Sequence, residues 1–132
     1  MSKLAAPHGG GPLLPLLGAE NARAGELDRA KDLKQLPMTS CEVSDILMFS
    51  MGAYTPLGGF MSEADWHGTC IDMALENGVF WPIPVTLSTD TNIADSIEIG
   101  EEIALMDPDQ GIIMAIMTVT EKYANDKTLE CE

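Results

Sequence analysis

The pattern of apolar and polar positions divides the first quarter of the chain into an irregular arm and a helix. Residues 1–18 hold seven glycines or prolines together with several leucines. That composition resists helix formation but can lay apolar side chains over a neighbouring surface, so we expect an ordered arm or an irregular segment. Residues 19–36 are rich in Ala, Glu, Lys, Arg and Leu, which predicts a helix that Gly25 weakens and Pro37 limits.

A second helix is predicted after Thr39, whose spacing to Glu42 is that of a capping box. Apolar side chains recur at helical intervals as far as about Met51, which indicates a short buried helix. Gly52 can end this helix in a left-handed conformation, and residues 55–59 then have the composition of a turn.

The spacing of Ser62 and Asp65 repeats the capping box and predicts a third helix, which Asn77-Gly78 would close. Residues 79–87 are rich in aromatic and β-branched side chains, but two prolines remove amide donors from this run. The run therefore predicts an edge strand, or a strand with one unpaired side.

The last third of the chain has the pattern of a β-hairpin. A polar, turn-like stretch over 89–96 precedes two strand-like runs, 101–106 and 111–119, which an Asp-Pro-Asp-Gln turn separates. The second run is apolar on both faces over 112–117, which places it centrally in a sheet or barrel. Residues 121–132 are polar and contain no recognisable closing element.

The charge of the chain narrows its possible partners. Its 132 residues correspond to about one domain, and 21 acidic against 7 basic residues give a net charge of −14. Such a field repels phosphate backbones and anionic lipids, so we expect no nucleic acid and no membrane as partners. The longest apolar run is far short of the ~20 residues of a membrane helix, and the start of the chain lacks a signal peptide's features. We therefore expect a cytoplasmic protein.

Motifs for handling phosphate groups are missing from the sequence. Neither a P-loop nor a dinucleotide-binding glycine motif occurs, and the nearest approach is residues 8–11, His-Gly-Gly-Gly. These glycines could form an anion nest, but no strand precedes them, so we favour a flexible or docking arm. The predicted helix holds four cationic residues, at 23, 29, 31 and 34, and four acidic ones, at 20, 26, 28 and 32, which is typical of a solvated face.

The remaining candidates for chemistry have structural explanations that we prefer. His8 and His67 are too far apart in the sequence to form a local metal pair. The loop aspartates are favoured in turns and their spacing matches no calcium loop, and the cysteines, odd in number, are interpreted as reduced, small buried hydrophobes. These residues are Asp90, Asp95, Asp107, Asp109, Cys41, Cys70 and Cys131. We predict no catalytic, cofactor-binding or metal site in this chain.

Four segments of the chain resemble, in order, the amino-terminal domain of ATP sulfurylases (sulfate adenylyltransferases). Residues 51–61 resemble the signature Gly-x-Phe-Ser-Pro-Leu-x-Gly-Phe-Met, with Tyr54 in place of Phe and Thr55 in place of Ser. The other three segments are Pro-His-Gly-Gly at 7–10, Trp-Pro-Ile-Pro-Val-Thr-Leu at 81–87, and Ala-Leu-Met-Asp-Pro at 104–108, which leads into 112–123. The first of these and the Asp65-Trp66 pair look most like the enzymes of bacteria with dissimilatory sulfur metabolism.

The resemblance implies an α+β, PUA-like fold over residues 1–132, a small mixed β-barrel with flanking short helices. It places the active site in a following nucleotidyltransferase domain, whose Gln-x-Arg-Asn-Pro, His-x-x-His and Gly-Arg-Asp motifs do not occur in this sequence. In the intact enzyme, sulfate would attack the α-phosphorus of Mg-ATP to give adenylyl sulfate and pyrophosphate, and in sulfur oxidisers the reaction runs backwards. This chain alone would be inactive, a scaffold for the catalytic domain and for contacts in a homo-oligomer.

Two other functions stay open at this point. PUA-like folds also occur in RNA-binding proteins, although the net charge of −14 opposes that function here. The chain could also be a stand-alone acidic interaction module without catalysis, which would require its natural reading frame to stop near Glu132. The scaffold hypothesis predicts that an apolar docking surface is left exposed.

Overall fold

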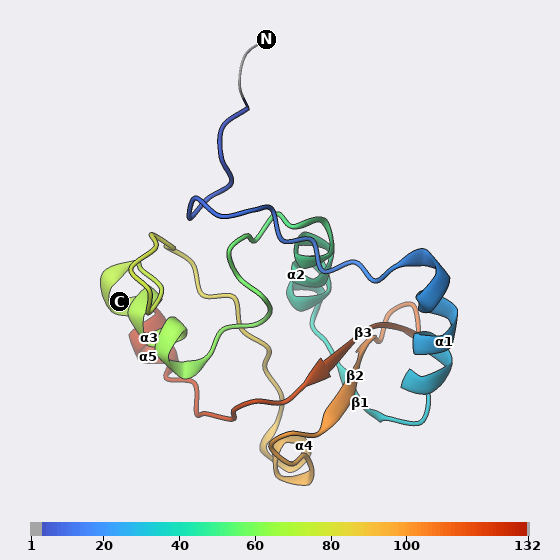
Figure 1. Ribbon diagram of the computed structural model, residues 1–132. Helices are drawn as coiled ribbons and strands as arrows, with labels where there is room; N and C mark the ends of the chain where they lie inside the picture. Colours follow the sequence, from blue (N-terminus) through green and yellow to red (C-terminus); the bar gives the residue numbers. More distant parts are fainter. Residues whose placement is uncertain (1–3, 132) are drawn as a thin grey trace.

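A computed structural model describes residues 4–131 and contains five helices and three strands in this range. In chain order the elements are α1 (Glu20–Ala30), β1 (Lys34–Pro37), α2 (Ser40–Met51), α3 (Glu63–Asp72), α4 (Thr91–Ser96), β2 (Glu102–Asp107), β3 (Ile112–Thr118) and α5 (Lys127–Cys131). Figure 1 shows the sheet beside α1, with α3 and α5 together at the opposite end and α2 between them. The first three residues of the predicted arm and Glu132 lie outside the described range.

The sheet is mixed, as expected for this α+β fold. Its order is β1-β2-β3, with β1 parallel and β3 antiparallel to β2. The three strands form an open sheet within the described residues, in place of the expected barrel. The predicted hairpin is confirmed, but β2 is the central strand and β3 lies at an edge, so the central placement of 112–117 is wrong for this chain.

The helix predicted over 19–36 is shorter than expected. It ends at Ala30, and the stretch Lys34–Pro37 forms β1. Leu36 explains the difference, because in β1 its side chain is buried within the sheet, only 3% exposed, opposite Leu105 of β2. Burial in the sheet outweighs the local helix propensity of this stretch.

The second predicted helix is confirmed with both of its ends. Thr39 accepts a hydrogen bond from the Glu42 amide, and the Glu42 carboxylate accepts one from the Thr39 amide, which completes the capping box. The other Glu42 oxygen accepts from the amide and the hydroxyl of Ser88, each at 2.7 Å. This buried carboxylate therefore ties the start of α2 to a loop far along the chain, and Gly52 ends the helix with φ 78°.

The third helix begins as predicted but ends earlier. The hydroxyl of Ser62 accepts a bond from the Asp65 amide, whereas the Asp65 carboxylate reaches the Glu76 amide. The helix ends at Asp72 and not at Asn77-Gly78, because the chain folds back over Gly68. A β-carbon at that glycine would lie 2.5 Å from the carbonyl oxygen of Ala74, so only a glycine permits this close approach.

Two further predictions are corrected. Residues 79–87 form no named strand, and only a single bridge joins Ala74 to Phe80, consistent with the amides that the two prolines remove. The stretch 89–96 contains the short helix α4, because the Asp90 carboxylate caps it by accepting from the Ile93 amide. No helix among residues 4–131 is long and apolar enough to cross a membrane.

The core consists of two clusters of buried side chains. We call them the sheet cluster (Leu36, Met38, Ile97, Ile103, Leu105 and Val119) and the aromatic cluster (Phe49, Leu57, Met61, Trp66, Leu75 and Val85). Phe60 packs against both. The helix α5, which the sequence did not reveal, closes the aromatic cluster through a hydrogen bond of 2.7 Å from the indole of Trp66 to Glu130.

Candidate functional site

Three of the four family-like segments meet on one side of the aromatic cluster. The His8 Nε2 atom donates to the carbonyl of Phe80 at 2.6 Å, and its ring lies 6.0 Å from that of Trp81. Tyr54 of the segment 51–61 packs edge-on against Trp81 and Phe49, with ring centroids 5.8 Å and 5.1 Å apart. The structure therefore uses the amino-terminal motif as a docked arm.

The backbone of the arm is attached to the end of α2. The amide of Leu16 donates to the carbonyl of Phe49, and the amide of Leu14 donates to the hydroxyl of Thr55. Gly52 allows this approach, because a β-carbon there would lie 3.0 Å from the nitrogen of Pro15. The arm is irregular, as expected, and its leucines Leu13, Leu14, Leu16 and Leu17 remain exposed. Their attachment is through the main chain.

Tyr54, the tyrosine of the signature, forms a polar link and is not a reactive group. Its hydroxyl donates to Asp45 Oδ1 at 2.7 Å. Burial, followed by this bond to a carboxylate, raises the pKa of Tyr54 to about 12. The phenol therefore stays protonated at neutral pH and orients the loop after α2.

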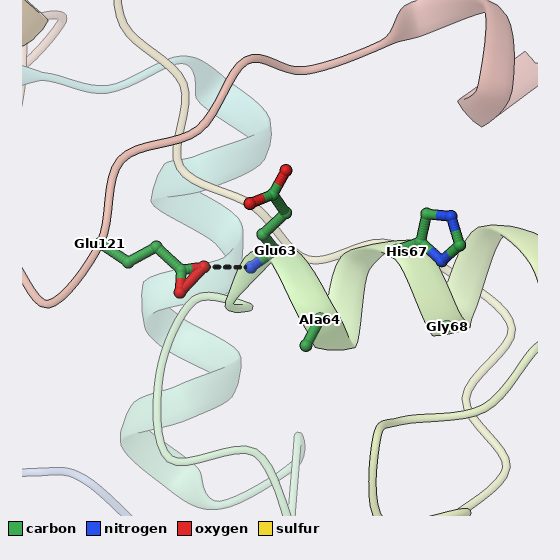
Figure 2. A pocket seen from close by; sticks show the side chains of 5 residues that line it. All are labelled: Glu63, Ala64, His67, Gly68 and Glu121. Carbon is green, nitrogen blue, oxygen red and sulfur yellow. Dashed lines mark hydrogen bonds between the residues drawn. The ribbon is translucent and has the colours of Figure 1, made fainter.

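Figure 2 shows the shallow pocket at the start of α3. Glu121 accepts a hydrogen bond from the amide of Glu63, and His67 lies one turn further along the helix. His67 is exposed and far from the docked His8 arm in the sequence, and the described residues contain no group of three potential metal ligands. Asp90 caps α4, and Asp107 accepts hydrogen bonds from the amides of Asp109 and Gln110 in the hairpin turn.

Five of the basic residues that the structure describes each bind a carboxylate or a carbonyl. Arg29 bridges Glu26 and Glu102, and Lys31 pairs with Asp28. Lys34 pairs with Glu101 and contacts the carbonyl of Ser96, Lys122 donates to the carbonyls of Ala94 and Ile97, and Arg23 donates to that of Gly18. These cations face carboxylates or carbonyls on separate elements, so they do not converge on a polyphosphate. The predicted solvated, charge-balanced face is present on α1 only in part, because Lys31, Asp32 and Lys34 lie beyond the end of this helix.

The cysteines differ from the expectation of small buried hydrophobes. Cys41 and Cys131 are exposed, and only Cys70 is half-buried, against the aromatic cluster. Burial raises the pKa of the Cys70 thiol above its usual value, which makes it a poor nucleophile at neutral pH. Cys41 is exposed because it lies in the first turn of α2, on the solvent side.

A second concave surface is a groove of about 500 Å³ along β3, which we call the edge groove. Sequence reasoning predicted an exposed apolar surface but not its location. Side chains of the arm, α1, α2, the loop before α3 and β3 line it, among them Leu17, Leu27, Ile46, Phe60, Ile113 and Ile116. Its lining is largely apolar, and the charged side chains that line it are Arg23 and Glu26.

The mixed sheet, its flanking helices and the docked arm define a known class of domain. The family model of the PUA-like domain matches residues 5–132. The chain belongs to this family.

Particular relatives extend the comparison. The chain is 51% identical over 131 residues to a sulfate adenylyltransferase of Thiobacillus denitrificans and 53% identical over 133 residues to one of Syntrophobacter fumaroxidans. These matches cover 99% and 100% of this chain but only 32% of each relative, so the chain spans about a third of their length. A solved structure described as a hexameric APS kinase from Thiobacillus denitrificans superposes with a TM-score of 0.76 and 34% identity, covering 92% of this chain and 24% of that one.

Proposed function

We propose that this chain is the amino-terminal scaffold domain of a sulfate adenylyltransferase. The observation that carries the proposal is identity of 51–53% over essentially the whole chain to enzymes of that name, of which it spans about a third. The intact enzyme would interconvert ATP and sulfate with adenylyl sulfate and pyrophosphate. Its chemistry would reside in the remaining two thirds.

The described residues of this chain do not fit a nucleotide site. Mg-ATP needs converging cations or a phosphate cradle, whereas Arg29, Lys31 and Lys34 are paired with carboxylates on α1, β2 and the loop before β2. We therefore assign no catalytic, cofactor-binding or metal residue here. Magnesium and ATP would bind to the catalytic domain of the same polypeptide.

The partners of the domain would be its own catalytic domain and further copies of the enzyme. The similarity to a chain described as part of a hexameric enzyme supports a homo-oligomer. The net charge of −14 supports neither nucleic acid nor membrane as a partner, and a cytoplasmic role in sulfur metabolism follows from the activity.

The test is an assay of ATP formation from adenylyl sulfate and pyrophosphate, on the 132-residue chain and on the intact polypeptide from the source organism. We expect the chain of 14.2 kDa to be inactive and the longer polypeptide to be active. A source polypeptide of 14.2 kDa without activity would contradict the proposal and favour a stand-alone acidic interaction module.

A further inference from the structure

The charged residues of this chain are distributed unevenly along it. Residues 4–19, 46–62 and 77–89 contain no Asp, Glu, Lys or Arg, so all 21 acidic and 7 basic residues lie elsewhere. These three uncharged segments include three of the four family-like segments. In a chain with a net charge of −14, they are where a second anionic molecule could approach without meeting a carboxylate.

The three uncharged segments are bonded to one another in the fold. The arm passes over α2, as Figure 1 shows, and is hydrogen-bonded to the end of that helix. Its His8 donates to the carbonyl of Phe80 in the third segment. The amide of Met61 donates to the carbonyl of Val85 at 2.9 Å, which joins the second segment to the third. Together they form one continuous surface outside the aromatic cluster, which we call the neutral face.

The neutral face also holds most of the exposed apolar side chains. Nine of the fourteen large apolar side chains that are exposed among the described residues belong to its three segments. Phe80 and Ile83 are 59% and 67% exposed, and Leu47 and Met51 are exposed one turn apart on α2. None of these four lines the edge groove, so this surface is separate from β3. A gathering of exposed apolar side chains indicates a contact with another molecule.

We propose that the neutral face is an interface between two copies of the enzyme. A symmetric pair presents the same surface from both partners, so an uncharged surface meets an uncharged surface. Such a pair buries apolar side chains while the carboxylates of both copies stay at the rim or beyond it. This inference rests on the proposed function, because it assigns the homo-oligomer of that enzyme to a particular surface of this domain.

The charge of the domain favours a second copy as the occupant. Two domains of charge −14 repel each other, and the segments outside the neutral face all contain carboxylates. A basic partner would be recruited by those carboxylates and would not need an uncharged surface. The neutral face is therefore the surface on which two like-charged copies meet with the least repulsion. The similarity to a chain described as part of a hexameric enzyme supports the same occupant.

The test is sedimentation velocity on the intact enzyme with Ile83→Glu, and with Ile99→Glu as the matched control. Ile99 is 60% exposed, close to the 67% of Ile83, but it lies beside Glu98 and outside the neutral face. Ile83→Glu should weaken the association of copies by about 100-fold or more, because it buries an unpaired charge in the interface. Ile99→Glu should leave the mass of the assembly unchanged. Both side chains are exposed, so neither change removes core packing.

A second position and a salt series sharpen the test. Leu47→Glu changes another segment of the neutral face, where Leu47 is 47% exposed, and should weaken association as Ile83→Glu does. Raising the salt concentration from 0.1 M to 1 M shortens the screening length from about 10 Å to about 3 Å. Association through the neutral face should therefore tighten with salt, because the repulsion between the two domains is screened. Association through ion pairs would loosen under the same change.

Several results would overturn the proposal. The intact enzyme could sediment as a monomer, Ile83→Glu and Ile99→Glu could act alike, or association could weaken as salt is raised. Ile83→Glu could also lower the melting temperature of the intact enzyme without changing its mass, while Ile99→Glu changes neither. That result would make the rest of the same polypeptide the occupant. Each of these results can occur in an enzyme that makes ATP normally, so failure of this inference is distinct from failure of the proposed function.

Discussion

The aromatic cluster and the sheet cluster are both tightly packed, but only the first is covered on its outer side by distant parts of its own chain. His8 brings the arm to Phe80, and Tyr123 donates to the carbonyl of Met61 at 2.9 Å. Trp66 holds α5 through Glu130. The sheet cluster lies along β1 and β2 and ends at the edge groove along β3.

The two regions therefore have different roles in this domain. Long-range polar links hold distant segments of the chain against the aromatic cluster. The sheet edge keeps apolar side chains and main-chain groups available. A scaffold domain needs both properties, because one region must hold its shape while the other joins a neighbour.

The largest expected effect comes from opening the aromatic cluster. Leu57 is 5% exposed, so Leu57→Ala should lower the free energy of unfolding by about 2–5 kcal/mol, the lost transfer energy plus a cavity. Ile116→Ala, at the half-buried edge, should cost about 1 kcal/mol in the isolated chain, since that site is already partly open to water. Urea unfolding of the 132-residue variants measures both values. Equal losses would mean that the edge is as well covered as the aromatic cluster.

A smaller but more local effect is expected at Gly68. Gly68→Ala should destabilise the chain by about 1–3 kcal/mol, because the new β-carbon would meet the carbonyl of Ala74 at 2.5 Å and force the end of α3 away from the aromatic cluster. Gly25→Ala is the matched control within α1, where a β-carbon meets no atom within 4 Å. It should stabilise by about 0.5–1 kcal/mol, as an alanine usually does in a helix interior. A destabilising Gly25→Ala, or a neutral Gly68→Ala, would contradict this explanation.

The local signals of the sequence predicted the parts of the fold that local chemistry decides. The Thr39 capping box, the αL glycine at Gly52 and the hairpin at 107–110 were all predictable, because each depends on residues a few positions apart. β1 and α5 were not, because Leu36 and Trp66 find their partners about 65–70 residues away along the chain, at Leu105 and Glu130.

The sequence predicted what kind of site to expect but not where it lies. The sequence indicated an exposed apolar surface, and the composition of 112–117 singled out that strand as one with two neighbours. Its position at the edge depends on β1 pairing with the other side of β2, which no local pattern reveals. The placement of the family-like segments around Trp81 likewise depends on the contact between His8 and Phe80, two residues that are 72 positions apart in the sequence.

The smallest expected effect should appear in an alkaline titration, which reports on the aromatic cluster alone. The chain has two tyrosines, and both Tyr54 and Tyr123 pack against that cluster. Burial is the main cause that raises the pKa of each to about 12, against about 10 in an unfolded chain. The folded state therefore keeps protons that the unfolded state loses, so this contribution to stability is complete below pH 10 and disappears between about pH 10 and 12.

The near-ultraviolet absorbance of tyrosinate measures this titration directly. We expect a midpoint near pH 12 in the folded chain and near 10 in concentrated urea. Tyr123→Phe isolates Tyr54, and Ile116→Lys should leave the midpoint unchanged because no tyrosine packs against the sheet cluster among residues 4–131. A folded chain whose tyrosines ionise near pH 10 would show that the aromatic cluster admits water. The contrast between a closed cluster and an open sheet edge would then have to be abandoned.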